Sequence, residues 1–218
     1  MENKFIRFSG ICLIIGSLLM IITMVLHPSG GSIEHILKIS TILMVSHSLA
    51  IFSLPFVGFG FYGLSMALLT ENKISILAFI ISCQGLIAGM LAAMINGLTL
   101  PLFLSNFSAN EIEQNNNVIS PIIKYGSSIN HPLDYILIVG LFLAIGIWSV
   151  LIILGAKFPK WVGYFGISLL LLGILGIFFQ YNFIALSGFR IVVFGMATWI
   201  IIIGVLMSRV NEVSGKSI

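Results

Sequence analysis

Six long apolar stretches dominate this chain of 218 residues. A helix needs about 20 consecutive apolar residues to cross the roughly 30 Å of hydrocarbon in a bilayer, and each stretch has or approaches that length. Their ranges are 8–26, 39–70, 74–100, 135–156, 161–180 and 191–208. The pattern predicts an all-α, polytopic membrane protein in which six transmembrane helices form one bundle, a single domain over residues 1–218.

The composition excludes an ordinary soluble domain. Hydrophobic residues make up 59% of the chain and charged residues 8%, whereas roughly a quarter of the residues in a soluble domain are charged. The basic residues are dispersed between the apolar stretches, so the sequence offers no patch for nucleic acid. The two cysteines, Cys12 and Cys83, lie inside apolar stretches and suggest neither a disulfide framework nor a metal knuckle.

The distribution of lysine and arginine predicts the orientation, because cytoplasmic loops are enriched in both. Three basic residues, Lys38, Lys124 and Arg190, fall on one side of the six spans. The other seven fall on the side that carries both chain ends, namely Lys4, Arg7, Lys73, Lys157, Lys160, Arg209 and Lys216. Both termini are therefore predicted to be cytoplasmic, with the one long connection, residues 101–130, on the outer side.

Two local patterns predict how this outer loop is built. Ser108 and Glu111 have the spacing of a capping box, which predicts a short helix. The apolar residues that would hold such a helix on the membrane surface are Ile112, Val118, Ile119, Ile122 and Ile123. Pro132 and Asp134 are typical of the first turn of a helix, so the fourth span is expected to open near His131.

Small residues predict where the helices pack closely. Gly85, Gly89, Ala93 and Gly97 recur every four residues and therefore form one stripe on the third span. Such stripes let helix backbones approach each other within a membrane, either inside one chain or between two copies. The segment Gly58-x-Gly60-x-x-Gly63 matches the dinucleotide-binding pattern, but it lies within an apolar span and fits close packing or flexibility near Pro55 better.

Polar side chains gather at the predicted outer edge of the membrane. His27 closes the first span and His47 lies on the outer part of the second. All four histidines of the chain belong to this edge, and with carboxylates nearby they are candidate zinc or other divalent-metal ligands: His27, His35, His47 and His131. The candidate ligand-binding residues are Glu34, Asn96, Asp134, Gln180, Tyr181 and Arg190.

The spacing of these histidines does not match a known metal motif. There is no His-Glu-x-x-His and no His-x-His. His35 and His47 are twelve residues apart, about 120° around a helix, so they would not share a helix face. Structural roles at the membrane interface are therefore an alternative for each histidine.

The segment Phe158-Pro159-Lys160-Trp161-Val162-Gly163-Tyr164-Phe165-Gly166 resembles a turn found in uncharacterised six-helix bacterial membrane proteins of the domain-of-unknown-function type. The final span of those proteins often holds a tryptophan, as Trp199 does here. The resemblance implies a multi-pass protein of the bacterial cytoplasmic membrane and brings no activity with it. In physical terms, Lys157 and Lys160 hold the turn at the cytoplasmic face and Trp161 anchors it among headgroups.

The sequence leaves three hypotheses for function. The leading one is not enzymatic: a membrane protein that binds a lipid-like or small amphipathic ligand, or a partner, at its outer face. The second is a metal-dependent membrane enzyme that uses the four histidines, with Glu34 or Asp134 as acid or base. The third is a small-molecule transporter, which is disfavoured because no charged residue lies deep inside a predicted span.

Overall fold

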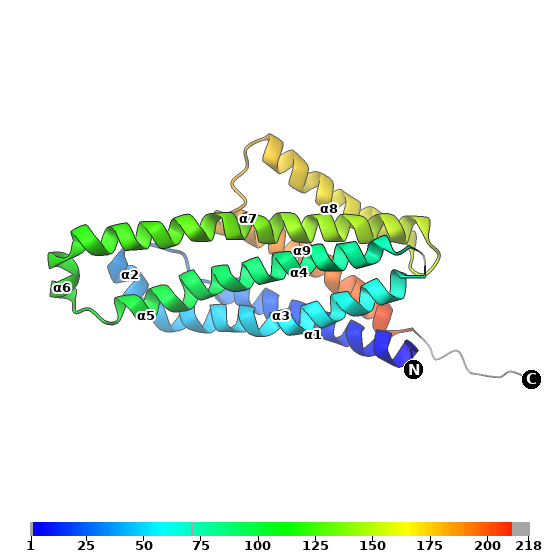
Figure 1. Ribbon diagram of the computed structural model, residues 1–218, viewed down its shortest axis with the longest axis horizontal. Coiled ribbons are helices and arrows are strands. Elements are labelled where there is room, and N and C mark those ends of the chain that lie inside the picture. Colours follow the sequence, from blue (N-terminus) through cyan, green and yellow to red (C-terminus); the bar gives the residue numbers. More distant parts are fainter. Residues whose placement is uncertain (1, 71, 211–218) are drawn as a thin grey trace, which may run out of the picture.

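The structure is a computed structural model that describes residues 2–70 and 72–210. Within these ranges the chain is helical and contains no strand (Figure 1). The elements are α1 Glu2–Leu26, α2 Ile33–Lys38, α3 Ser40–Leu68, α4 Ile74–Ala92, the π-helix η1 Ala93–Thr99, α5 Leu100–Leu104, α6 Ala109–Gln114, α7 Asn116–Leu154, α8 Lys160–Phe178 and α9 Leu186–Ser208.

Six segments of the described chain are long and apolar enough to cross a membrane, which confirms the predicted fold class. They are α1, α3, the continuous rod α4–η1–α5, α7, α8 and α9. The helix α1 begins and α9 ends at the same end of the bundle, here named the proximal end (Figure 1). The opposite end, which carries α2 and α6, is named the distal end. Which membrane face each end occupies stays a prediction, and Lys216, one of the basic residues behind it, lies outside the described residues.

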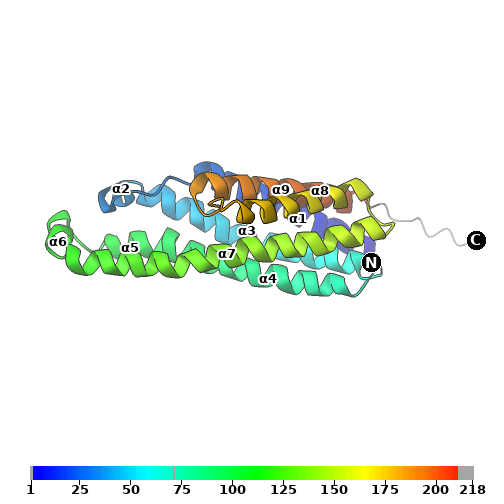
Figure 2. The ribbon, with the colours of Figure 1, turned by 90° about the horizontal axis from the view of Figure 1, so that it is seen from above.

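The helices pack as two connected groups. In the first, α1 lies against both α3 and α9, while in the second α4 lies against α7 (Figure 2). The helix α8 packs chiefly against α7 and diverges from the bundle toward its C-terminal end (Figure 1). Phe178 and Phe179 at that end are 77% and 74% exposed, as expected for side chains that face lipid.

Glycines set the closest helix approaches in the first group. A methyl group on Gly60 or Gly63 of α3 would overlap the side chains of Leu13 or Ser9 on α1. On the other side of α1, a Cβ at Gly10 would stand 2.6 Å from the carbonyl oxygen of Gly204 on α9. Close packing, one of the two predicted roles, is therefore the role of Gly60 and Gly63, whereas a Cβ at Gly58 would come no closer than 3.8 Å to a neighbouring atom.

The small-residue stripe on the third span packs within the chain. A Cβ at Gly85 would stand 3.3 Å from the carbonyl oxygen of Leu137 on α7, and one at Gly89 would meet the Leu137 side chain. Gly97, farther along the same stripe, lies directly against the imidazole of His47 on α3. The stripe thus joins α4 and η1 to two neighbouring helices.

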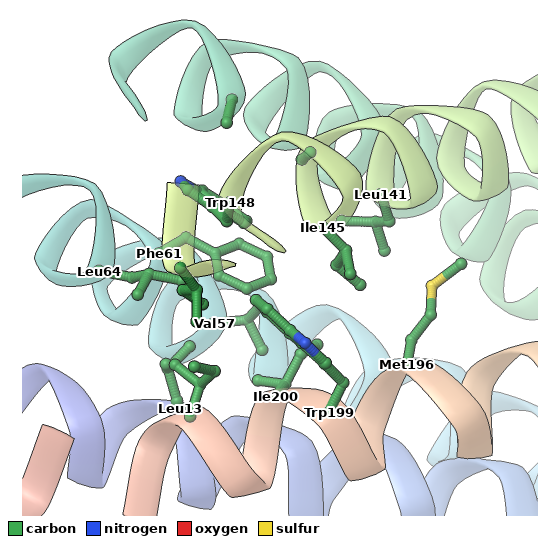
Figure 3. Close-up of a cluster of buried hydrophobic side chains, with 14 of the residues drawn as sticks. Leu13, Val57, Phe61, Leu64, Leu141, Ile145, Trp148, Met196, Trp199 and Ile200 are labelled. Atoms are coloured by element: carbon green, nitrogen blue, oxygen red, sulfur yellow. The ribbon is translucent and has the colours of Figure 1, made fainter. Parts of the chain in front are cut away.

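Two tryptophans organise the buried centre of the bundle (Figure 3). Trp148 of α7 and Trp199 of α9 are fully buried and stack with ring centroids 6.4 Å apart. The indole of Trp148 donates to Ser65 Oγ, and that of Trp199 donates to the Val162 carbonyl, each over 3.1 Å. Each large apolar ring therefore has a partner for its one polar atom, as burial of tryptophan requires.

The turn before α8 uses the spaced glycines of its motif for packing. A Cβ at Gly163 would approach the Ser149 carbonyl oxygen to 2.6 Å, and one at Gly166 would overlap the Ser149 hydroxyl. The glycines thus seat the start of α8 on α7. Trp161, in the first turn of α8, is 55% exposed and does not share this packing contact.

The outer connection differs from its prediction. The capping box of Ser108 and Glu111 is present and starts α6, as predicted. However, α7 begins at Asn116 and not near His131, where the fourth span is predicted to open, so residues 116–130 are helix rather than loop. Pro132 lies inside that helix and does not open it.

The start of α7 is predicted too late because hydropathy indicates which segments contact lipid and does not indicate where a helix begins. The first half of α7 is mostly exposed and contains many polar residues, so it carries no apolar signal. Its 39 residues extend about 58 Å, roughly twice the thickness of the hydrocarbon layer. Val118, Ile119, Ile122 and Ile123 therefore belong to this projecting part of α7, not to a separate surface helix.

We expect Gly63→Ala to destabilise the bundle by about 1–3 kcal/mol, because the new methyl group overlaps Ser9 across the α1–α3 contact. The matched control is Gly126→Ala on α7, where a Cβ would meet no atom within 4 Å. That change should be neutral or stabilising by up to about 1 kcal/mol. Thermal unfolding in detergent measures both, and equal midpoints for the two variants would contradict the packing role.

Candidate functional site

A cavity of about 510 Å³ lies in the distal half of the bundle. Its walls come from α1, α3, the α4–η1 rod, α7 and α9, and the segment around α2 closes part of it. Five of the site residues predicted from the sequence line it, namely His27, His47, His131, Asn96 and Asp134. Five polar residues that were not among the candidate site residues also line it, namely Thr23, Ser29, Ser53, Ser127 and Asn130.

The polar lining residues gather at one level of the cavity. On each of four helices a polar lining residue lies about two to three turns nearer the distal end than an apolar one. The pairs, polar before apolar, are His27 and Met20 on α1, His47 and Leu54 on α3, Asn96 and Leu86 on η1 and α4, and Asn130 and Leu137 on α7. Apolar residues also line the cavity distal to this level, among them Leu43, Leu100 and Ile123. The cavity is therefore amphipathic, with its polar part at this level and apolar walls on both sides.

Two histidines form a close pair in the polar part. The rings of His27 and His47 have centroids 4.7 Å apart. His47 Nδ1 lies 2.8 Å from the Leu43 carbonyl oxygen, and His27 Nδ1 lies 2.9 Å from that of Pro28. Because a carbonyl can only accept, each Nδ1 carries the hydrogen, and in the neutral ring Nε2 is left as an acceptor.

The environment of His27 favours its neutral form. Burial is the main factor that lowers the pKa of His27 below its ordinary value of 6.5. The hydrogen bond to Pro28 opposes this change, and the nearby positive charge of Arg190 adds to it. At neutral pH the His27 ring is therefore an uncharged hydrogen-bonding group.

The π-helix η1 places Asn96 and accommodates His47. Single π-turns inside α-helices occur frequently at functional sites. Here Asn96 lines the cavity from η1. The next residue, Gly97, leaves room for the His47 ring, which is only 9% exposed.

Asn130 and Asp134 form the second polar group of the cavity. Asn130 Nδ2 donates to Asp134 Oδ2 over 2.6 Å, one helical turn apart on α7. Asn130 is 7% exposed, and its Oδ1 has no hydrogen-bond partner in the described part of the chain. The Thr23 hydroxyl, on a residue that is 2% exposed, is likewise unpaired there. A buried polar atom without a partner costs about 1–3 kcal/mol, so these two atoms are sites of unfavourable burial beside the cavity.

Arg190 supports the site without lining it. Its Nε donates to the Met24 carbonyl over 3.2 Å and one of its terminal nitrogens donates to the His27 carbonyl over 2.9 Å. These carbonyls belong to the C-terminal turn of α1 and the residue after it, where backbone acceptors lack intrahelical partners and positive charge is favourable. Arg190 therefore ties α9 to the segment that carries His27.

Gln180 and Tyr181 end α8 and do not line the cavity. Gln180 has a φ of 55°, in the left-handed region. Its N–H donates to the Ile177 carbonyl, and the N–H of Tyr181 donates to the Gly176 carbonyl. This is the Schellman arrangement that closes a helix C-terminus.

Glu34 and His35 belong to the short helix α2. The backbone N–H of His35 donates to Ser32 Oγ, which caps that helix. Neither side chain lines the cavity, although Ile36 of the same helix does. The four histidines predicted as metal ligands are therefore divided: three line the cavity and His35 does not.

The described residues contain no group of three or more His, Cys, Asp and Glu side chains placed to hold a metal ion. The histidine pair and the Asn130–Asp134 pair thus stand as hydrogen-bonding groups of one cavity. Comparison with known proteins finds no matching family model, no matching curated protein and no matching solved structure.

The pairing of Asn130 with Asp134 could be predicted from the sequence only if the start of α7 were known. Asn130 and Asp134 are four residues apart, which brings side chains together only on a helix. The sequence places the start of the fourth span after Asn130, so the pair is not visible until α7 is known to begin at Asn116. Thr23 lies within an apolar stretch and has no comparable signal.

We expect Arg190→Gln to lower the free energy of unfolding by about 1–3 kcal/mol, because the two α1 carbonyls lose a charged donor. Lys124→Gln, an exposed charge on α7, is the control and should change stability by less than about 0.5 kcal/mol. Unfolding midpoints in detergent distinguish the two. If both variants matched the wild type, Arg190 would have no such bracing role.

We expect the protein to become less stable as the pH falls below about 6.5 because of His27. In the unfolded chain His27 takes up a proton near that pH, while in the folded chain its lowered pKa keeps it neutral to a lower pH. The unfolded state then binds more protons, and acid favours unfolding. His27→Gln should weaken this pH dependence in thermal unfolding measured between about pH 5 and 7.5. An unchanged slope would show that His27 does not contribute.

Proposed function

We propose that this multi-pass membrane protein binds a lipid-like or small amphipathic molecule in its distal cavity. The observation that carries the proposal is a polar level in the cavity beside an apolar proximal wall. An amphipathic molecule has the same division, so its head would meet the polar part and its tail the apolar part. The cavity volume of about 510 Å³ falls within the roughly 300–1,000 Å³ of small-molecule sites.

The position of the cavity relative to a bilayer supports the proposal. Counting about 20 residues back from the proximal end of α3 reaches the region of His47. The same count along α7 from Leu154 reaches Asp134. The polar part of the cavity then lies at the boundary between hydrocarbon and headgroups, and the apolar part lies within the hydrocarbon.

The membrane and its face are further parts of this proposal. The Lys and Arg distribution supports a cytoplasmic proximal end, which puts the cavity in the outer leaflet. The resemblance of the turn at residues 158–166 supports a bacterial cytoplasmic membrane. Under this assignment the ligand enters from the outer leaflet or the external medium.

Ala50→Phe should abolish retention of an amphipathic ligand, because Ala50 lines the cavity and a phenyl ring would fill part of it. The control Ala156→Phe adds the same ring at an exposed turn at the proximal end and should leave retention unchanged. Native mass spectrometry of detergent-purified protein measures the retained mass. A wild-type protein without a bound amphiphile, or equal retention in Ala50→Phe, would contradict the proposal.

A further inference from the structure

The histidine pair offers hydrogen-bond acceptors to the cavity. The Nδ1 hydrogens of His27 and His47 are both engaged with backbone carbonyls, which leaves two Nε2 acceptors. Asn130 Nδ2 donates to Asp134 Oδ2, so one oxygen of that carboxylate already has a partner on the protein.

The charges around the cavity point the same way. Asp134 contributes a carboxylate, and no lysine or arginine is among the lining residues. Arg190, which is outside the lining, directs its guanidinium to the carbonyls of Met24 and His27, and His131 is the titratable lining residue whose charge acts on Asp134. An anionic head would therefore meet a carboxylate without a lining cation, whereas a cationic head would gain a charged partner.

We infer that the molecule bound in the distal cavity carries a primary ammonium head with an alkyl tail. The Asp134 carboxylate is the charged acceptor for the N–H donors of an ammonium group, and the Nε2 atoms of the histidine pair are neutral acceptors in the same cavity. The apolar wall formed by Met20, Leu54, Leu86 and Leu137 receives the tail. This inference rests on the proposed function and adds the chemical class of the head.

The test compares three probes that differ only in the head: dodecylammonium, dodecanoate and dodecanol. Each is added at equal concentration to the full-length, detergent-purified protein, and native mass spectrometry counts the bound probe. We expect dodecylammonium to bind at least about tenfold more tightly than dodecanoate, because charged hydrogen bonds form with one head only. Dodecanol, a neutral donor, should fall between them.

Asp134→Asn removes the charge and keeps the side-chain shape, so it should reduce the preference for ammonium over carboxylate to less than about threefold. Glu34→Gln is the matched control, a carboxylate on α2 that does not line the cavity, and should keep the preference. The ranking of the probes on the wild-type protein decides the inference even if Asp134→Asn fails to fold.

The outcomes separate the two proposals. If dodecanoate binds as well as dodecylammonium or better, the ammonium head is wrong while amphiphile binding stands. If none of the probes binds, the proposed function fails and the inference fails with it. If the preference survives Asp134→Asn in folded protein, the assignment of the head to this carboxylate is overturned.

Discussion

Close contact between helix backbones at glycine positions is the interaction on which this bundle depends. Within a bilayer, burial of apolar side chains does not favour helix association, because lipid tails are as apolar as leucine. Packing at short range must supply the attraction. Gly10 and Gly204 meet between α1 and α9, Gly60 and Gly63 receive α1 on α3, and Gly85 faces α7.

These contacts also account for where the cavity lies. The tightest contacts of α1 with α3 and α9 fall toward the proximal end, and the stacked tryptophans fill the centre. At the distal end the same helices are joined by polar contacts, including the bonds from Arg190 to the end of α1. The amphipathic cavity lies between the helices on the distal side of the tryptophan pair.

Local hydrogen bonds determine which atoms in the polar part of the cavity can accept from a ligand. Backbone carbonyls determine which nitrogen of His27 and His47 carries the hydrogen, and Asp134 orients the amide of Asn130. What remains for a ligand is the Nε2 acceptor of each histidine and the Asp134 carboxylate. The proposed ammonium head follows from that carboxylate and from the absence of lysine and arginine in the lining.

The sequence by itself determined the class of the fold, because a span of about 20 apolar residues has few alternatives to a membrane helix. It also predicted the helix cap at Ser108 and the packing role of Gly60 and Gly63, since both depend on neighbours along one helix or on residue size. Only the tertiary structure decided that α7 extends to Asn116, that η1 is a π-helix, and that His47 meets His27 while His35 does not. Those features depend on contacts between segments far apart in the chain, which hydropathy and local spacing do not record.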